Sequence, residues 1–312
     1  MSLTIFIDGA SGTTGLEIAD RLAGRDEFTQ IVLDEKERKE RSARRDALNA
    51  ADVAILCLPD DAAREAVALL APESSTRVID ASSAHRTADG WTYGFPELVG
   101  REALANARRI SNPGCYPTGF LALITPLVRA GCLPDDWPYT VNAVSGYSGG
   151  GKALIQRFDE HPDIAFRAYG LSLDHKHLSE MQQYAALRYP PVFSPGVVPA
   201  MRGMIVDVPI SREAIPRCGS PSVLLACLQD YYADAALIQV HPASDNPQEI
   251  LLHRHQQPWD GMDLFVFHNS QATQLRLVAR LDNLGKGASG AVVQTLNLMA
   301  GINEYAGLHL RN

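Results

Sequence analysis

The sequence predicts an α/β fold, a doubly wound parallel sheet joined to a second domain of α+β type. Three observations predict it. Strand-like and helical segments alternate up to residue 80, a glycine-rich turn directly follows the first strand-like segment, and the pattern changes near residue 139. With 312 residues, of which 46% are apolar, the chain is long enough for one large or two medium domains.

In the first part, short runs rich in β-branched and aromatic residues indicate buried strands. The run Leu-Thr-Ile-Phe-Ile at 3–7 is the clearest, and a loop at 8–15 follows it. The predicted strands are 3–7, 30–33, 53–58 and 77–80, and the predicted helices are 16–23 and 62–70. Strands that alternate with helices in this way form a parallel sheet with helices on both faces.

The second part has strand-like segments with longer and less regular connections. A glycine cluster at 145–151 interrupts it, and a glycine-rich loop from residue 283 leads into an apolar helix at 291–299. The predicted strands are 139–144, 204–208, 264–268 and 275–281. This arrangement indicates an α+β domain.

Charge and composition narrow the class of function. The net charge of −8 argues against a nucleic-acid partner, because that affinity depends on clustered positive charge, and the basic run 36–45 is mixed with acids as on a solvated face. No apolar stretch approaches the roughly 20 residues that cross a bilayer, and residues 1–4 do not begin a signal peptide. We therefore expect a cytoplasmic protein with no membrane contact.

The glycine loop predicts a dinucleotide site. Gly9, Gly12 and Gly15 lie between a strand and a helix, where missing side chains let backbone amides approach a pyrophosphate. The spacing differs from the commoner Gly-x-Gly-x-x-Gly, and an ordinary tight turn is the alternative; the preceding strand favours the dinucleotide. The choice between NAD and NADP stays open, because Asp34 suits the ribose of NAD whereas Lys36 and Arg38 suit the phosphate of NADP.

One cysteine is placed for chemistry. The five cysteines are odd in number and include no Cys-x-x-Cys pair, so their spacing indicates neither a disulfide framework nor a zinc site. Cys115 follows turn residues and precedes Pro117, which suits the first turn of a helix, and a helix N-terminus stabilises a thiolate. We predict Cys115 as the nucleophile and a packing or surface role for Cys57, Cys132, Cys218 and Cys227.

A nucleophilic thiol needs a base that takes its proton and later returns it to the departing group. His175 and His177 are the best candidates, since on an extended segment both rings would point to one face. Which of them acts, or whether one only binds substrate, stays open. A zinc site at this His-x-His pair is the rival, but no third ligand is near in the sequence, so no metal is expected.

Seven motifs in order carry a family resemblance. They are Gly9–Gly15, Asp80-x-Ser82-x-x-x-Arg86, Tyr93–Glu97, Asn112–Thr118, Ser145–Lys152, His175–His177 and Asp282–Gly290. In these motifs the sequence resembles the N-acetyl-γ-glutamyl-phosphate reductases, relatives of aspartate-semialdehyde dehydrogenase. It is shorter than their commoner form and has His85 where that form usually has phenylalanine, so it looks like the short, type 2 form.

The resemblance implies a Rossmann domain at 1–114 completed by the C-terminal helix at 284–312, and a catalytic and dimerisation domain at 115–283. It implies NADP as cofactor and a homodimer or homotetramer. It also implies the reaction, in which a Cys115 thioester made from N-acetyl-glutamyl 5-phosphate is reduced to the 5-semialdehyde. Because the chain is of the short form, the family's cofactor contacts after the second strand carry over poorly.

The matching motifs also imply binding residues. Arg86 supplies a planar fork for a phosphate or carboxylate, and Asn112 with the Cys115 amide suits a developing oxyanion. The other substrate-binding residues are expected to be Ser145, Gly146 and Gly149. Cofactor-binding residues are expected to be Gly9, Ser11, Gly12, Thr13, Thr14, Gly15, Lys36, Arg38, Pro59, Ser82, Asn283, Gly285 and Gly287.

Two other functions are weighed. A reductase with the same chemistry could act on aspartyl phosphate or an amino-adipyl phosphate instead. A nucleotide-binding regulator without catalysis is a third reading, but the presence of both Cys115 and the histidine pair speaks against it. In every reading the partners are small molecules.

Overall fold

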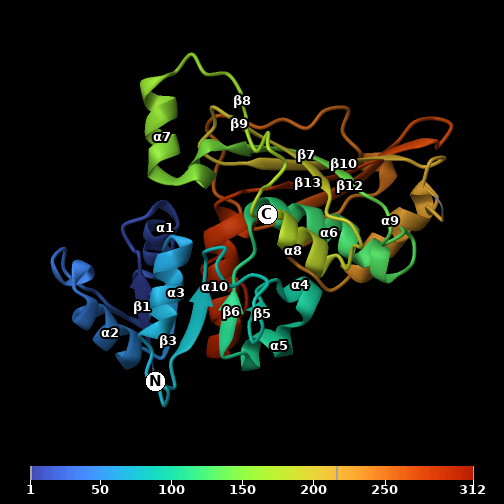
Figure 1. Cartoon of the computed structure of the whole chain (residues 1–312). Helices are drawn as coiled ribbons and strands as arrows, with labels where there is room; N and C mark the ends of the chain where they lie inside the picture. The colour runs from blue at the N-terminus through green and yellow to red at the C-terminus, as the bar shows by residue number, and fades with distance from the viewer. Residues whose placement is uncertain (1, 216, 312) are drawn as a thin grey trace. The chain divides into compact units, whose positions relative to one another are not determined.

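A computed structural model describes residues 2–215 and 217–311, which form two compact units (Figure 1). The first unit holds the residues up to 113 together with 288–308, and the second holds 114–287 with the residues from 309 on. Each is described by itself.

The first unit is built on a six-stranded sheet with the order β2-β1-β3-β4-β6-β5, in which every neighbouring pair is parallel. Its strands are β1 (Leu3–Asp8), β2 (Phe28–Ile31), β3 (Val53–Leu56), β4 (Arg77–Asp80), β5 (Thr92–Tyr93) and β6 (Arg109–Ser111). Its helices are α1 (Thr13–Leu22), η1 (Glu37–Lys39), α2 (Arg41–Ala50), α3 (Asp60–Ala68), α4 (Pro96–Val99), α5 (Arg101–Asn106) and α10 (Gly290–Ala300). Strand β2 is added on one side of β1, and the strands from β3 on are added on the other side. At such a change of strand order, α/β folds bind ligands at the carboxyl ends of the strands.

Alternating side chains of the strands enter two separate cores. Ile5 and Ile7 of β1 pack with α1, α5 and α10 on one face, whereas Phe6 packs with α2 and α3 on the other. A sheet that is buried on both faces needs such nearly continuous apolar strands. The predicted α/β class, with helices on both faces of a parallel sheet, is confirmed.

Arg77 ties two helices to the start of β4. Its Nε donates to Ala107 O at 3.0 Å, and Nη1 donates to Met299 O at 2.8 Å. Nη2 donates to Ala105 O at 2.6 Å and Leu104 O at 3.4 Å. Because these carbonyls end α5 and α10, one cation satisfies groups that a helix leaves without internal partners.

The second unit is built on a seven-stranded mixed sheet with the order β11-β12-β13-β10-β7-β9-β8. Its strands are β7 (Thr140–Gly146), β8 (Arg167–Ala168), β9 (Val192–Val198), β10 (Met204–Ser211), β11 (Ile238–Val240), β12 (Met262–His268) and β13 (Gln274–Leu281). Its helices are α6 (Cys115–Arg129), η2 (Tyr147–Gly150), α7 (Gly151–Glu160), α8 (Leu178–Tyr184), α9 (Pro221–Tyr231) and η3 (Ala243–Asp245). A π-helical turn, η4 (Gly285–Ser289), spans the boundary of the two units.

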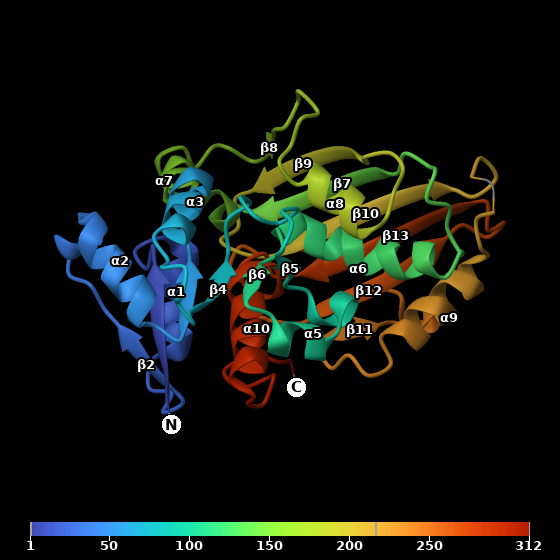
Figure 2. The same cartoon turned by 60° about the horizontal axis from the view of Figure 1, so that its bottom comes forward.

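Helices α6, α8 and α9 lie on one face of this sheet (Figure 2). Helix α6 is apolar on nearly all sides, and it approaches the sheet closely at Gly119, where a Cβ would lie 2.8 Å from Val206 Cγ2. Helix α6, which begins with Cys115, is therefore packed directly against the sheet.

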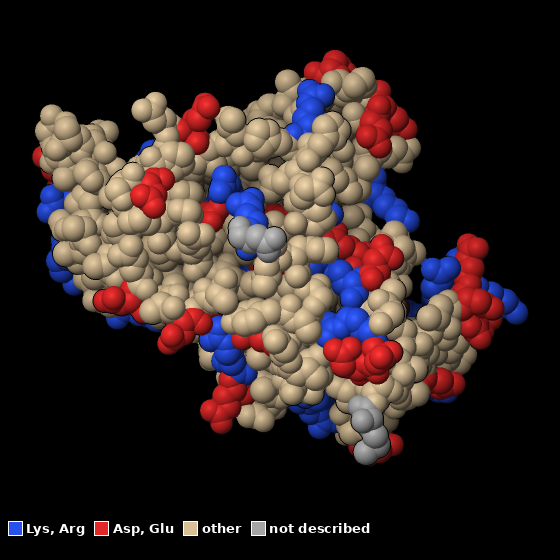
Figure 3. All heavy atoms as spheres, turned by 180° about the vertical axis from the view of Figure 1, so that it is seen from behind, with Lys and Arg blue, Asp and Glu red and all other residues tan. Residues whose placement is uncertain are grey.

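Most predicted strands are confirmed, with shifted ends. Residues 77–80 match β4, and the apolar helix predicted at 291–299 is α10. The bounds predicted for the strand at 30–33 are wrong. Strand β2 begins earlier and ends at Ile31, and Val32 is 82% exposed. Within the described ranges no helix is both long and apolar enough to span a bilayer. On the face drawn in Figure 3, basic and acidic side chains are interspersed.

Candidate active site

The loop between β1 and α1 is shaped by two close backbone approaches. Gly9 has φ +91°, and a Cβ there would lie 2.3 Å from Cys57 O. A Cβ on Gly15 would lie 2.5 Å from Gly9 O, and Gly12 N donates to Gly9 O at 3.0 Å. The loop therefore requires glycine at these points, and it leads directly into the first turn of α1 at Thr13.

The N-terminus of α1 is suited to an anion. Among the described residues no side chain caps it, and no acidic residue lies in its first turn. Asp8, at the end of β1, is held instead by Arg44 of α2, whose Nη2 lies 2.8 Å from its carboxylate. Exposed amides with the helix dipole behind them form a ready anion site. Ser11 and Thr14 are at least partly exposed in the same loop.

The segment after β2 engages Asp34 in a local turn. Its Oδ1 accepts from the backbone amides of Lys36 and Glu37, both at 2.8 Å, and its carbonyl accepts from Arg38 Nε at 3.3 Å. The Lys36 side chain is 87% exposed. The carboxylate of the one acid that suited the ribose of NAD is therefore engaged by the backbone of its own turn, which also carries the cations Lys36 and Arg38.

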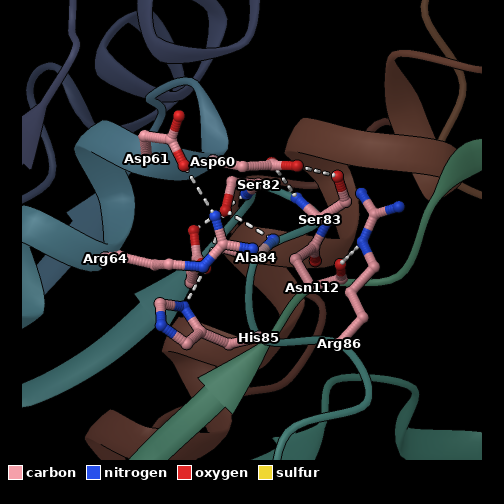
Figure 4. Close-up of polar contacts among 10 residues, drawn as sticks. Asp60, Asp61, Arg64, Ser82, Ser83, Ala84, His85, Arg86 and Asn112 are labelled. Atoms are coloured by element: carbon pink, nitrogen blue, oxygen red, sulfur yellow. Dashed lines mark hydrogen bonds and ion pairs between the residues drawn. The ribbon is translucent and has the colours of Figure 1, made fainter. Parts of the chain in front are cut away.

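Asp80 and Asp60 hold the loop after β4 that carries Arg86, and Figure 4 labels Asp60 together with Ser82, Ser83 and His85 of that loop. Asp80 accepts from Ser82 N and Ser82 Oγ, both at 2.8 Å, and its Oδ2 lies 2.6 Å from His85 Nδ1. Asp60, at the start of α3 directly after Pro59, accepts from the backbone and hydroxyl of Ser83. The position of Arg86 is therefore fixed before any ligand binds.

Arg86 and Asn112 lie side by side at the carboxyl edge of the sheet (Figure 4). Arg86 Nε donates to Asn112 O at 3.0 Å, and the Arg86 side chain is buried at 7% exposure. Asn112 Nδ2 donates to Pro113 O and Ala288 O, both at 3.3 Å, whereas its buried Oδ1 has no partner among the described residues. The structure thus brings these two predicted substrate residues together.

Cys115 is the first residue of α6, as its turn and proline predicted. The residue before it, Gly114, is the N-cap, and its amide donates to Glu180 Oε2 at 3.1 Å. Glu180 lies in α8 and is fully buried. The carboxylate therefore fastens the start of the nucleophile's helix to the helix that follows the histidine pair. No local sequence signal pointed to Glu180.

The histidine pair adjoins Tyr116, the residue after the nucleophile. The His175 and His177 ring centroids are 4.6 Å apart and lie 6.4 Å and 5.9 Å from the Tyr116 ring. The expected extended segment is wrong, because residue 177 has helical backbone angles and caps α8. The rings meet because the chain turns there, which also lets His177 N donate to His175 Nδ1 at 3.2 Å. That bond leaves the proton of neutral His175 on Nε2.

Tyr169 is a site residue that the sequence did not reveal. Its ring lies 5.6 Å from His175, whose ring also lies 6.4 Å from that of Tyr116. Burial raises the pKa of Tyr169 to about 12, and the nearby Cys115 sulfur adds to the rise. Burial also raises the pKa of Tyr116, with further contributions from Tyr169 and Cys115. Both phenols therefore keep their protons at neutral pH, and that of Tyr116 is donated to Gly196 O at 3.0 Å.

Three expected cofactor residues make tight contacts inside the second unit. Asn283 Nδ2 donates to Ser148 Oγ, and its Oδ1 accepts from Gly203 N, both at 2.9 Å. A Cβ on Gly285 would lie 1.8 Å from Trp259 O, and one on Gly287 would lie 2.9 Å from Cys115 Cβ. These contacts explain why asparagine and glycine occupy these three positions, independently of any ligand.

The glycine cluster after β7 joins the same region. A Cβ on Gly146 would lie 2.7 Å from Ala200 O, and Ser145 Oγ donates to Gly146 O at 3.0 Å. An added Cβ on Gly149 would be in ordinary contact with Ser145 Oγ and Asn283 Nδ2. The expected substrate residues Ser145, Gly146 and Gly149 therefore lie within one cluster. In the described part of the chain no three His, Cys, Asp or Glu residues gather as a metal site.

Comparison with known families agrees with both units. A family model described as semialdehyde dehydrogenase, NAD binding domain, matches residues 4–107, and one described as semialdehyde dehydrogenase, dimerisation domain, matches residues 115–283. Aspartate semialdehyde dehydrogenase II from Vibrio cholerae shares the fold with a TM-score of 0.67 at 18% identity, covering 96% of this chain and 99% of that one. A probable aspartate-semialdehyde dehydrogenase from Pseudomonas aeruginosa gives a TM-score of 0.70 at 16% identity over 96% and 98%.

Closer relatives are found by sequence. An N-acetyl-gamma-glutamyl-phosphate reductase of Brucella ovis is 50% identical over 311 residues, which are 96% of this chain and 100% of that protein. N-acetyl-gamma-glutamyl-phosphate reductase 2 of Nostoc sp. is 46% identical over 318 residues, 97% and 98% of the two chains. The resemblance carried by the seven motifs is confirmed, and the chain belongs to the semialdehyde dehydrogenase family and, within it, to the N-acetyl-γ-glutamyl-phosphate reductases.

Proposed function

We propose that the chain reduces N-acetyl-L-glutamyl 5-phosphate to N-acetyl-L-glutamate 5-semialdehyde and phosphate, as a step of arginine biosynthesis in the cytoplasm. The observation that carries the proposal is Cys115 at the first position of α6, in one cluster with Tyr116 and the imidazoles of His175 and His177. Relatives that match the full length of the chain are named for this activity.

The first unit fits a dinucleotide, because the first turn of α1, directly after the glycine loop, has no side-chain cap and no acidic residue. When bound, the reduced dinucleotide supplies the hydride. We propose NADP, since Asp34 is engaged in its own turn while Lys36 and Arg38 offer positive charge for the additional phosphate. The other residues proposed to hold it are Gly9, Ser11, Gly12, Thr13, Thr14, Gly15, Pro59, Ser82, Asn283, Gly285 and Gly287.

Cys115 forms and releases the covalent intermediate. Its thiolate attacks the acyl carbon, a C–S bond forms, and the C–O bond to phosphate breaks, which leaves a thioester. The start of α6 favours the thiolate over the thiol through the helix dipole. The Cys115 amide and Asn112 are proposed to hold the oxyanion that develops during attack.

The two histidines take different roles in this proposal. Neutral His175 carries its proton on Nε2, because its Nδ1 accepts from the backbone, so it acts as a hydrogen-bond donor to substrate oxygen. His177 then accepts the thiol proton and returns it to the thiolate that leaves when the aldehyde forms. Arg86, held by its loop, is proposed to bind an anionic group of the substrate. Ser145, Gly146 and Gly149 are also proposed as substrate-binding residues.

We also propose that the enzyme works as a homodimer or homotetramer, since its second unit matches a dimerisation domain. Neither nucleic acid nor membrane is proposed as a partner.

The test is the reverse reaction, phosphate-dependent oxidation of N-acetyl-glutamate semialdehyde, followed by absorbance of the reduced dinucleotide with NADP or NAD. Cys115→Ala should abolish turnover and leave NADP binding, measured by fluorescence, intact; Cys218→Ala, at a partly exposed site, is the matched control. Full turnover by Cys115→Ala would remove the thioester mechanism. Faster turnover of aspartate semialdehyde or of an amino-adipate semialdehyde would move the assignment to a different acyl phosphate.

A further inference from the structure

Two acidic side chains lie at the carboxyl ends of neighbouring strands in the first unit. Asp8 ends β1, and Asp34 follows β2, the strand that pairs with β1 through Ile31 and Phe6. In α/β folds that bind NAD, an acid at this edge accepts a hydrogen bond from the adenosine ribose, and its charge repels the additional phosphate of NADP. Asp34 is engaged by the backbone of its own turn. The partner of Asp8 therefore bears on the choice of dinucleotide.

Arg44 of α2 engages both oxygens of the Asp8 carboxylate. Its Nη2 donates to Oδ2 at 2.8 Å, and its Nε donates to Oδ2 at 3.1 Å and to Oδ1 at 3.3 Å. The Arg44 and Asp8 side chains are 14% and 8% exposed, so the pair lies largely out of solvent. Charge-assisted bonds of this two-pronged kind are short and fix the geometry of both groups. Arg44 therefore neutralises the acid and occupies both of its oxygens.

The packing of α2 holds Arg44 in this place. Ala47 and Leu48 of α2 pack with Phe6 in the core on one face of the sheet. Arg44 precedes them by three and four residues, so it lies on the same side of the helix. Asp8 lies two residues after Phe6 in β1, so its side chain points to the same face of the sheet. Burial of α2 thus brings the two charges together before any ligand binds.

We propose that Arg44 determines the preference for NADP over NAD by masking Asp8. The inference rests on the proposed cofactor and deepens it. With Asp8 paired to Arg44 and Asp34 engaged in its turn, neither acid at this edge accepts from the ribose or repels a phosphate on it. Arg44 acts through Asp8, and in this it differs from Lys36 and Arg38, which are proposed to meet the phosphate directly.

The test is calorimetric titration of the full-length protein with adenosine 2′,5′-bisphosphate and with adenosine 5′-monophosphate. The two ligands differ only in the phosphate on the ribose, and neither carries nicotinamide, so no substrate and no turnover are involved. We expect the wild-type protein to bind the bisphosphate more tightly. Arg44→Met keeps a long side chain and removes the cation. The ratio of the two affinities should then fall by roughly tenfold or more, because unmasked Asp8 repels the phosphate and accepts from the free hydroxyl.

A double variant separates masking from direct contact. Asp8→Asn combined with Arg44→Met carries neither charge, so it should recover most of the wild-type ratio. A direct bond from Arg44 to the phosphate would leave the double variant as poor as Arg44→Met, and that result would overturn the inference. Arg45→Met is the matched control, since Arg45 lies in the same helix and forms an exposed pair with Asp46 at 2.8 Å. A fall in Arg45→Met equal to that in Arg44→Met would assign the effect to the overall charge of α2 and also overturn it.

Asp8→Asn alone keeps the inference testable if Arg44→Met does not fold, because losing one partner of a buried pair is destabilising. It removes the acid and retains the cation, so the ratio should stay at the wild-type value or rise. A fall would contradict masking. Wild-type preference for the monophosphate would remove both the proposed NADP and this inference, whereas preference for the bisphosphate with an unchanged ratio in Arg44→Met would remove only the role of Arg44.

Discussion

Gly287→Ala is expected to displace Cys115 while leaving its thiol chemically unchanged. An added Cβ would lie 2.9 Å from Cys115 Cβ and 3.1 Å from Asp282 O, whereas ordinary contact begins at 3.4 Å. The start of α6 and the turn at residue 287 would have to separate by about 0.5 Å at the sulfur-bearing carbon. Gly287 has no positive φ, so the alanine adds volume without backbone strain.

The size of the effect follows from that displacement. Reacting groups must be held to within roughly 0.5 Å, and a misplacement of about 1 Å reduces rate by about 100-fold. We therefore expect kcat/KM to fall by about 10-fold to 100-fold. Overpacking of this kind also destabilises by about 1–3 kcal/mol, so a lowered thermal midpoint should accompany the loss.

Two measurements decide whether displacement of Cys115 is the cause. The rate of alkylation of Cys115 by iodoacetamide and kcat/KM should fall together. Gly219→Ala is the matched control, because its Cβ would meet flexible side-chain ends, Leu224 Cδ2 at 3.1 Å and Val223 Cγ1 at 3.3 Å, in the same unit but at the other end of α6. Wild-type kcat/KM and alkylation in Gly287→Ala would refute the packing argument.

Five further substitutions test other parts of the structure. Arg77→Met should lower the free energy of unfolding in urea by about 2–4 kcal/mol, since it leaves four carbonyls without their cation; an unchanged midpoint would contradict this. Gly15→Ala should weaken NADP binding by tenfold or more in a fluorescence titration, because its Cβ would lie 2.5 Å from Gly9 O and deform the loop. With a pKa of about 12, raised by burial and by the Cys115 sulfur, Tyr169 keeps its proton through neutral pH, so Tyr169→Phe should reduce kcat/KM by about tenfold without moving the pH profile. His177→Asn should remove the limb of the pH–rate profile that belongs to the base, whereas His175→Asn should reduce kcat and preserve that limb; the opposite result would exchange the two roles.

Strands could be predicted where burial on both faces leaves an unbroken apolar run, as in β3 and β4. The misplaced β2 shows the limit of that signal. Ile31, Val32 and Leu33 form an apolar run, but only the first of them pairs with β1, and Val32 is 82% exposed. Helix α2 has no apolar stripe in its sequence, because it buries only Ala47 and Leu48 and its other residues are charged, polar or alanine. Its place is set by packing against the sheet, which local sequence does not encode.

The residues of the site also differ in whether they could be predicted from the sequence. Cys115 could be predicted because its signals, a turn before it and a proline after it, are local and the structure places it at a helix start. Tyr169 and Glu180 could not, since each matters through a residue distant in sequence, Tyr116 for one and Gly114 for the other. The histidine pair was found for a reason that proved wrong, because a turn and not an extended segment brings the rings together.

A glycine in a motif has two physical meanings that the sequence cannot separate: a ligand approaches the backbone, or the protein's own chain does. Gly285 is of the second kind, since a Cβ would lie 1.8 Å from Trp259 O, so its replacement would deform the fold before it could report on a ligand. At Gly149 an added Cβ would be in ordinary contact with its neighbours. Loss of substrate affinity in Gly149→Ala would therefore be evidence for a ligand, whereas the same loss in Gly285→Ala would not.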